Sequence, residues 1–332
     1  MSKQFDFIGI GDITTDAFIR LSGDDATVTT TPEGKKIKIT FNFGDKIEYD
    51  FVKEISSVGN SPNAAVSAHR LGLHSALITD LGDDYHGANC LTALQKEGIA
   101  TDFVKVHTGK LSNYHYVLWY EEERTILVKH EEYPYALPGM ENPKWLYLSS
   151  LGEKSIPFQL EVASFVKNNP ETKLSFQPGT FQIKLGYETL KDIYAVSELF
   201  FCNAEEAHRI LGGENYDIKK LLAGIRELGP RIVVITDGPN GAYSYDGEEM
   251  LHMPMYPDPA PPIDRTGAGD SLASTFTVMR ALGKSVREAL TYAPINSMSV
   301  VQKVGAQEGL LTIPELEDWL KKAPKNYIIQ KI

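Results

Sequence analysis

The chain has 332 residues, of which 42% are hydrophobic and 23% charged, enough for one large globular domain or two small ones. Its formal net charge of −11 argues against a general nucleic-acid-binding protein, which needs a basic face. No apolar run approaches the ~20 residues of a membrane-spanning helix, the first residues lack the apolar segment of a signal peptide, and the two cysteines are too few for a disulfide framework. We therefore expect a cytoplasmic protein with neither a membrane nor a nucleic acid as partner.

The first part of the chain contains one buried strand and two alternating blocks. Residues 5–10 form a short apolar run, which predicts a buried strand. Apolar and polar side chains alternate over residues 36–55 on both sides of Gly44-Asp45, so we predict a half-buried hairpin that turns there. A second alternating block covers residues 113–130. Together the two blocks predict a small sheet that projects from the main domain, with an apolar face covered by a ligand or a second subunit.

From residue 144 onward, short apolar runs alternate with helical patterns. The apolar runs lie at residues 145–148, 174–176, 199–201 and 232–235. Such alternation is typical of a parallel sheet whose two faces are covered by helices. We therefore predict an α/β fold, and no interdomain linker is evident.

The most informative motif is D-R-T-G-A-G-D at residues 264–270, which leads into a helical pattern with Leu272, Phe276 and Met279 on one face. A turn of small residues at a helix start presents free backbone N–H groups and the positive end of the helix dipole, a combination that binds phosphate. Asp270 stands at the edge of this turn, where a carboxylate can accept a proton from a hydroxyl group. The simpler interpretation is a tight turn with Asp270 as a helix cap.

This motif resembles the second signature of the PfkB, or ribokinase-like, carbohydrate kinases, usually D-T-x-G-A-G-D. The chain has Arg265 where that family most often has Thr. The sequence G-N-S-P-N-A-A at residues 59–65, followed by A-H-R-L-G at residues 68–72, resembles the first signature, G-G-x-x-x-N-x-A, with Val58 in place of its first glycine. The resemblance therefore extends to both signatures.

The resemblance implies a ribokinase-like three-layer α/β/α domain with a mainly parallel central sheet and a small β-sheet lid over the sugar site. We expect one such domain over residues 1–332, with the lid formed by about residues 17–55 and 110–131. Because the lid of these kinases is often used for dimerisation, the resemblance also implies a homodimer through the lid.

The resemblance assigns the substrate site to the first third of the chain. It implies that Asp16 binds substrate hydroxyls, and Asn60 and Asn63 offer the donors and acceptors that suit a polyol. From the residues alone, Asp16 could equally be a solvent-facing acid and the two asparagines helix caps. The predicted substrate-binding residues are Asp12, Asp16, Gly59, Asn60, Asn63 and Arg124.

Two later segments resemble the nucleotide site of the family. The sequence N-A-E-E at residues 203–206 is similar to the motif N-x-x-E, which organises magnesium and the nucleotide phosphates, although an N-capped surface helix would look alike. The sequence T-D-G-P-N-G at residues 236–241 resembles the nucleotide loop T-x-G-x-x-G, and by itself could be a hairpin turn. The resemblance implies cofactor binding by Asn203, Glu206, Thr236, Gly238, Gly241, Thr266 and Asn296, Mg²⁺ held through water by Glu206, and K⁺ as a possible activating ion at Asp264.

We therefore interpret the chain as a phosphotransferase that moves the γ-phosphate of ATP to a hydroxyl of a small sugar, as ribokinase and fructokinase do. Asp270 is the predicted base, and the N–H groups of Gly267, Ala268 and Gly269 are the predicted anion hole. Because most substrate candidates are acids and amides, the sequence favours a free sugar over a sugar phosphate. Arg124 could pair with a carboxylate, as in a keto-deoxy sugar acid, or with the adjacent glutamates.

Two alternatives stay open. A nucleoside kinase of the same family would need a stacking face for a base, which the aromatic residues could offer, although at alternating spacing such residues more often pack within a sheet. The aromatic candidates are Phe18, Tyr114, Tyr116 and Trp119. A non-catalytic sugar- or nucleotide-binding sensor is the alternative from another class, against which Asp270 argues because a sensor needs no base.

Overall fold

The computed structural model describes residues 4–22, 27–31, 36–121, 123–213 and 217–332, which include a ten-stranded, a four-stranded and a two-stranded sheet. In the ten-stranded sheet, neighbouring strands from β7 to β13 run parallel, and β14 to β16 complete it as antiparallel strands. In spatial order its strands are β7 (Val104–His107), β6 (Ser75–Gly82), β1 (Phe7–Ile10), β10 (Trp145–Leu148), β11 (Lys173–Phe176), β12 (Ser197–Asn203), β13 (Ile232–Thr236), β14 (Ala242–Tyr245), β15 (Met250–Met253) and β16 (Gln330–Lys331). The predicted strands at residues 5–10, 145–148, 174–176, 199–201 and 232–235 all lie in this sheet.

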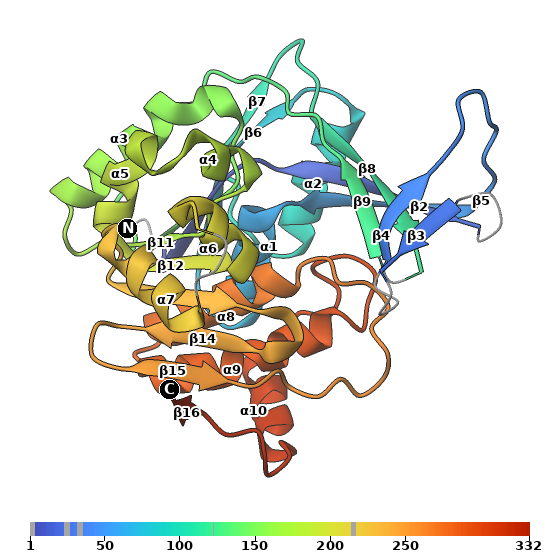
Figure 1. Cartoon of the computed structure of the whole chain (residues 1–332). Helices are drawn as coiled ribbons and strands as arrows, with labels where there is room; N and C mark the ends of the chain where they lie inside the picture. Colours follow the sequence, from blue (N-terminus) through green and yellow to red (C-terminus); the bar gives the residue numbers. More distant parts are fainter. Residues whose placement is uncertain (1–3, 23–26, 32–35, 122, 214–216) are drawn as a thin grey trace.

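Helices cover both faces of the large sheet, so the domain has three layers (Figure 1). The helices are α1 (Asn60–Arg70), α2 (Tyr85–Lys96), α3 (Ile156–Asn168), α4 (Thr180–Leu185), α5 (Tyr187–Val196), α6 (Ala204–Leu211), α7 (Ile218–Glu227), α8 (Ala268–Ala281), α9 (Val286–Val300) and α10 (Ile313–Lys321), with short 3₁₀ turns η1 (Glu153–Ser155) and η2 (Gly238–Asn240). None of the helices in the described part of the chain has the length and hydropathy needed to cross a bilayer.

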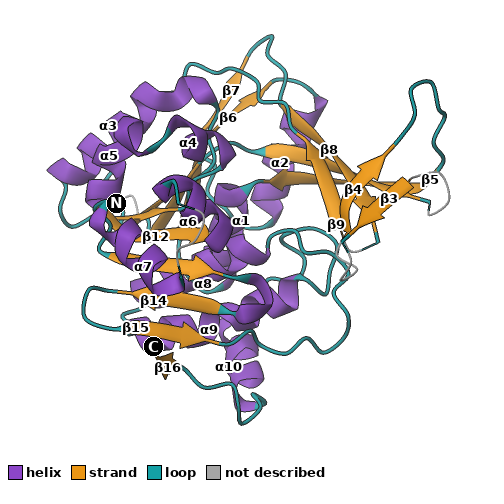
Figure 2. Cartoon of the chain, in the orientation of Figure 1, coloured by secondary structure: helices purple, strands orange, loops and turns teal. Residues whose placement is uncertain are grey.

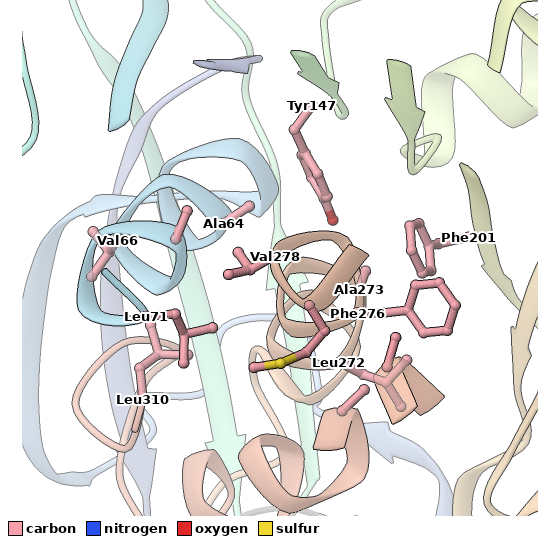
Figure 3. Close-up of a cluster of buried hydrophobic side chains, with 14 of the residues drawn as sticks. Ala64, Val66, Leu71, Tyr147, Phe201, Leu272, Ala273, Phe276, Val278 and Leu310 are labelled. Carbon is pink, nitrogen blue, oxygen red and sulfur yellow. The ribbon is translucent and has the colours of Figure 1, made fainter. Parts of the chain in front are cut away.

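Alternation along the strands divides the core into two clusters, one on each face of the sheet. On β1, Phe7 packs into the cluster that holds α1, α2, α8, α9 and α10, whereas Ile8 packs into the cluster that holds α3, α5 and α7. Figure 3 shows the first cluster around α8, where the rings of Phe201 and Phe276 meet edge to face with centroids 5.7 Å apart. Burying an aromatic side chain of this size contributes roughly 1.5–3 kcal/mol. The packing fixes the position of α8 relative to the end of β12.

A four-stranded sheet, called the small sheet below, stands apart from the helical layers (Figure 2). In spatial order it contains β5 (Tyr49–Val58), β2 (Thr14–Leu21), β8 (Asn113–Tyr120) and β9 (Glu123–Leu127). The segment from the start of β2 to the end of β5 covers residues 14–58, slightly beyond the predicted limits of 17 and 55. The second alternating block forms β8 and β9, which pair antiparallel.

The predicted hairpin over residues 36–55 is wrong. Residues 36–40 form β4, which pairs with β3 (Thr27–Thr30) in a separate two-stranded ribbon, while β5 pairs with β2. Alternation reports that a segment can lie in a sheet with one face covered, but it does not identify the partner strand. The side chain of Phe43, beside the predicted turn, is fully exposed, so this segment lacks the half-buried face that the pattern suggested.

Candidate active site

A cavity of about 670 Å³ lies where the ends of the parallel strands face the small sheet. Clefts of this size are typical of small-molecule sites, and in open α/β sheets ligands bind beyond the carboxyl ends of the strands. The predicted residues that line it are Asp12, Asp16, Gly59, Asn60, Asn63, Arg124, Asn203, Glu206, Thr236, Thr266, Gly267, Gly269 and Asp270. Residues from both signature segments therefore meet in one cavity.

The carboxylate of Asp270 is held by three side-chain amides. Asn60 Nδ2 and Gln177 Nε2 donate to Oδ1 over 2.9 and 3.1 Å, and Asn63 Nδ2 donates to Oδ2 over 2.8 Å. The helix-cap interpretation of the two asparagines is wrong, because α1 begins at the N-cap Gly59 without a side-chain cap bond. Their amides instead orient the carboxylate of Asp270 and donate hydrogen bonds to its oxygens within the cavity.

The environment of Asp270 tunes its basicity. Burial raises the pKa of this carboxyl above its usual range, against the lowering effects of the hydrogen bonds from Asn63 and Gln177 and of the positive charge of Arg124. Gln177 in turn accepts a hydrogen bond from the hydroxyl of Tyr147, whose pKa burial raises well above normal, so that this hydroxyl stays a donor. A carboxylate with a raised pKa is a better proton acceptor than an exposed one.

The turn before α8 is shaped by Gly267, the N-cap of the helix. Its φ of 81° lies in the left-handed region, and a Cβ atom there would lie 2.4 Å from Cβ of Ala306. Both facts require glycine at this position. The first N–H groups of a helix have no acceptor within it. At the start of α8 the N–H of Ala268 donates to the backbone oxygen of Arg265 over 3.4 Å, and the N–H groups that follow it, beside Asp270, can bind an anion.

At the other end of the cavity, two carboxylates each face a histidine. Asp12 accepts hydrogen bonds from Tyr135 Oη over 2.9 Å and from the backbone N–H of Gly152 over 2.9 Å, and lies 2.8 Å from His130 Nδ1. Asp16 Oδ1 is buried and lies 3.3 Å from His115 Nδ1, within ion-pair distance but without hydrogen-bond geometry. The protein therefore supplies hydrogen-bond donors to both oxygens of Asp12, whereas Asp16 Oδ1 forms no hydrogen bond.

A second cavity of about 240 Å³ adjoins the first across the turn before α8. Three of the predicted residues line it without lining the first, namely Gly238, Gly241 and Ala268. Thr236, Arg265 and Gly269 line both cavities, so the two spaces share a wall. The segment at residues 236–241 is the turn between the antiparallel strands β13 and β14 and also a wall of this second cavity.

Glu206 lies at the junction of β12 and α6. Asn203 caps α6 by accepting from Glu206 N over 2.8 Å, and Glu206 Oε2 accepts from Asn203 N over 2.8 Å. Burial raises the pKa of Glu206 despite that backbone hydrogen bond. Both the capping interpretation and a position in the cavity hold for this motif. Within the described residues, no group of three His, Cys, Asp or Glu side chains converges as a metal site, so a divalent ion here would need water or phosphate ligands.

Two predicted residues lie away from both cavities. Asn296 has no exposed surface: its Nδ2 donates to Thr275 Oγ1 over 2.8 Å and its Oδ1 accepts from Leu311 N over 2.9 Å. The predicted nucleotide contact of Asn296 is therefore wrong, because the side chain ties α8 and α9 to the segment before α10. Asp264 is buried below the turn, where it accepts from the backbone N–H groups of Thr266 and Gly305.

The aromatic residues considered for base stacking are mostly structural. Phe18 lines the large cavity and meets Trp119 edge to face at 6.5 Å. Trp119 is itself buried under Arg20, whose guanidinium lies 4.4 Å from its ring centre. Tyr114 donates to Glu54 over 2.5 Å. Of the four aromatic candidates, only Phe18 lines the cavity.

Several residues of the cavity were not predicted from the sequence: Gln177, His115, His130 and Lys184. Gln177 immediately follows β11, so the rule that ligands bind beyond the carboxyl ends of parallel strands could have identified it. His115 pairs directly with Asp16 on β2, a register that only the structure shows. Lys184 follows from no pattern in the sequence.

Comparison with known proteins gives a consistent result. Residues 54–313 match the family model of the pfkB family carbohydrate kinases. The chain is 28% identical to a ribokinase of Bacillus subtilis over 270 residues, covering 79% of this chain and 87% of that protein. It is 24% identical over 273 residues to a nucleoside kinase of Methanothermobacter thermautotrophicus, covering 80% and 83%. The structure of Arabidopsis thaliana ribokinase complexed with ribose and ATP superposes with a TM-score of 0.77 at 19% identity, covering 96% of this chain and 99% of that one. The fold is therefore ribokinase-like.

Proposed function

The chain belongs to the pfkB family of carbohydrate kinases, and from that membership we propose that it transfers the γ-phosphate of ATP to a hydroxyl group of a small sugar. One observation carries this proposal: the Asp270 carboxylate, fixed by three amides at the start of α8, lines the same cavity as Asp16, whose buried Oδ1 accepts no hydrogen bond from the protein. One end of the cavity thus offers a base and an anion site, and the other end offers a hydroxyl acceptor.

In the proposed reaction, a substrate hydroxyl lies beside Asp270 and attacks the γ-phosphorus of ATP. A new P–O bond forms to the hydroxyl oxygen while the bond between the γ-phosphorus and the bridging oxygen of ADP breaks. The hydroxyl proton passes to the Asp270 carboxylate and leaves to solvent after the products separate. The N–H groups at Gly267, Ala268 and Gly269 compensate the charge of the transferred group.

We propose that the nucleotide lies along the second cavity, in contact with Thr236, Gly238 and Gly241, and that its phosphates reach the start of α8, where Thr266 lies. Mg²⁺ would neutralise phosphate charge, and Glu206 fits it as a partner through water, because only one of its two carboxylate oxygens forms the bond to Asn203 N. Asn203 would then position Glu206 through the cap of α6.

An activating K⁺ ion at Asp264 stays a prediction. This carboxylate joins the turn before α8 to the segment at Gly305, so an ion bound there would act on the shape of the anion site. Titration of K⁺ against Na⁺ in the kinase assay tests it: equal rates in both salts contradict the prediction.

We propose that the small sheet is the lid of the site and that its outer face joins a second copy. Water competes with the sugar as phosphate acceptor, so a covered site favours transfer. Exposed apolar side chains on this sheet, among them Tyr49, Val52, Tyr116 and Leu127, support a covered face in a dimer. Sedimentation equilibrium tests the dimer, and a monomer at all concentrations contradicts it.

A nucleoside kinase is the second candidate, favoured by the position of Phe18 in the cavity and by the similarity to a nucleoside kinase. A non-catalytic sensor is the third. ADP release, measured with ATP, Mg²⁺ and a panel of sugars and nucleosides, separates the three. Turnover with a sugar supports the proposal, turnover with nucleosides alone replaces it by the second candidate, and binding without any turnover supports the sensor.

A further inference from the structure

The cavity side of the small sheet carries buried polar atoms that the protein leaves without partners. Asp16 Oδ1 on β2, His115 Nε2 on β8 and Arg124 Nε on β9 are buried and form no hydrogen bond, although Asp16 Oδ1 lies 3.3 Å from His115 Nδ1. All three residues line the large cavity. Burying a polar atom without a hydrogen-bond partner is unfavourable, so three such atoms on one wall indicate a ligand that supplies the missing bonds.

The three atoms differ in what they can bind. Asp16 Oδ1 accepts hydrogen bonds, which suits a ligand hydroxyl, and His115 Nε2 can exchange a hydrogen bond with a hydroxyl in either direction. Arg124 only donates and carries a fixed positive charge, so its best partner is a carboxylate or a phosphate.

Arg124 forms no ion pair with a carboxylate of the described residues, in contrast to Arg70, whose guanidinium binds Glu97 at 2.9 Å. The expected pairing of Arg124 with its adjacent glutamates is partly outside the described residues, because Glu122 is not among them, and Glu123 forms no ion pair with Arg124. Its charge instead acts toward the base, since it lowers the pKa of Asp270 against the effect of burial.

The position of Arg124 separates it from the nucleotide side of the site. Arg265 lines both cavities, whereas Arg124 lines the large cavity and not the second one. It also belongs to the same sheet as Asp16 and His115, the proposed hydroxyl-binding end. A second cation, Lys184 on α4, lines this large cavity too.

We propose that the phosphate acceptor is a polyhydroxylated anion, whose carboxylate or phosphate group binds Arg124 and whose hydroxyls bind Asp16 and His115. This inference rests on the proposed kinase function. It reverses the free-sugar preference that was predicted from the sequence, because that prediction was based on the acid and amide residues and not on the position of the Arg124 guanidinium. Lys184 adds positive charge at the same cavity.

The test compares acceptors and variants. kcat/KM is measured with D-gluconate and 2-keto-3-deoxy-D-gluconate as sugar acids, fructose 6-phosphate as a sugar phosphate, ribose and fructose as neutral sugars, and uridine as a nucleoside. We expect at least ~10-fold preference for one of the anionic acceptors, and the preferred compound shows whether the anionic group of the acceptor is a carboxylate or a phosphate.

Arg124→Ala should lower kcat/KM for that acceptor by about 10- to 100-fold, the range for a charged hydrogen bond, with KM for ATP unchanged. Arg124→Lys should lose less, because it keeps the charge and loses the fork geometry.

Arg20→Ala is the matched control, since Arg20 lies on the same sheet, stacks on Trp119 and does not line the cavity. It should keep the acceptor preference. Three results overturn the inference while the kinase function stands: preference for a neutral sugar or a nucleoside, an equal loss of kcat/KM with every acceptor in Arg124→Ala, or a raised KM for ATP in that variant.

If no acceptor is phosphorylated, the proposed function fails, and thermal shifts with the same compounds decide the inference separately. A rise in Tm with an anionic compound that Arg124→Ala abolishes supports it, and no rise overturns it.

Discussion

Asn63 Nδ2 donates a hydrogen bond of 2.8 Å to Asp270 Oδ2, although 207 positions separate the two residues in the chain. The bond joins the start of α1 to the start of α8. Gln307 extends it, since its Nε2 donates to Asn63 Oδ1 over 3.0 Å and to the backbone oxygen of Ser57 over 2.7 Å. The orientation of the proposed base therefore depends on three segments that are far apart in sequence.

Replacing the proposed base should abolish most of the activity. Asp270→Asn is expected to lower kcat by at least about 10²–10⁴-fold, the usual contribution of a positioned general base. Circular dichroism and Tm should stay close to those of the wild type. Near-normal turnover in a folded Asp270→Asn protein would refute the assignment.

The amide of Gln177 should act on the pH profile through Asp270. Its hydrogen bond favours the ionised carboxylate and so lowers the pKa of Asp270, which burial raises. Gln177→Leu removes that effect, the pKa rises further, and a higher pH is needed to deprotonate the base. The acidic limb of the kcat/KM profile should therefore move to higher pH. The exposed bond of Gln302 to Ala260 offers a control, since Gln302→Leu should leave the limb in place. A limb that stays fixed in Gln177→Leu contradicts this role.

Gly267→Ala should destabilise the protein through two effects. Its φ of 81° strains any residue with a side chain, and the added Cβ meets Ala306 at 2.4 Å. Together we expect a loss of about 1–3 kcal/mol in the free energy of unfolding, measured by urea denaturation. Gly283→Ala separates the two effects, because Gly283 has a φ of 82° with nothing within 4 Å of the added atom. Equal losses in both variants would mean that the contact with Ala306 has no energetic weight.

Asn296 should contribute to the stability of the fold and not to nucleotide binding. Asn296→Ala leaves the N–H of Leu311 buried without its acceptor, at a cost of about 1–3 kcal/mol in unfolding free energy. KM for ATP should remain unchanged, since the side chain is fully buried and lines neither cavity. A raised KM for ATP with unchanged stability would instead restore the nucleotide contact that the resemblance implied.

The large sheet could be predicted because each of its central strands carries its own signal. Strands covered on both faces are continuous apolar runs, so β10 was located from the sequence alone. The small sheet was harder, since alternation marks β4 and β5 as strands yet does not state that β5 pairs with β2. Pairing partners follow from tertiary packing, which no local pattern contains.

The site residues also include some that the sequence could predict and some that it could not. Asp270 and Asn63 lie in motifs with characteristic spacing, and both line the large cavity. Gln177 and His115 belong to no motif, and only the ends of the strands and the register of β8 against β2 bring them there. The sequence also failed for Asn296, because a buried asparagine in a helix can serve the packing of its neighbours as well as a ligand.

The bond between Asn63 and Asp270 also sets the order in which the enzyme becomes competent during its own synthesis. At translation rates of roughly 5–20 residues per second, the 207 positions between them correspond to about 10–40 seconds. During that interval the ribosome has delivered the strands and amides of the proposed acceptor end but not Asp270, the proposed base. If these assignments hold, a growing polypeptide is unable to transfer phosphate before its last third has emerged and folded against its first.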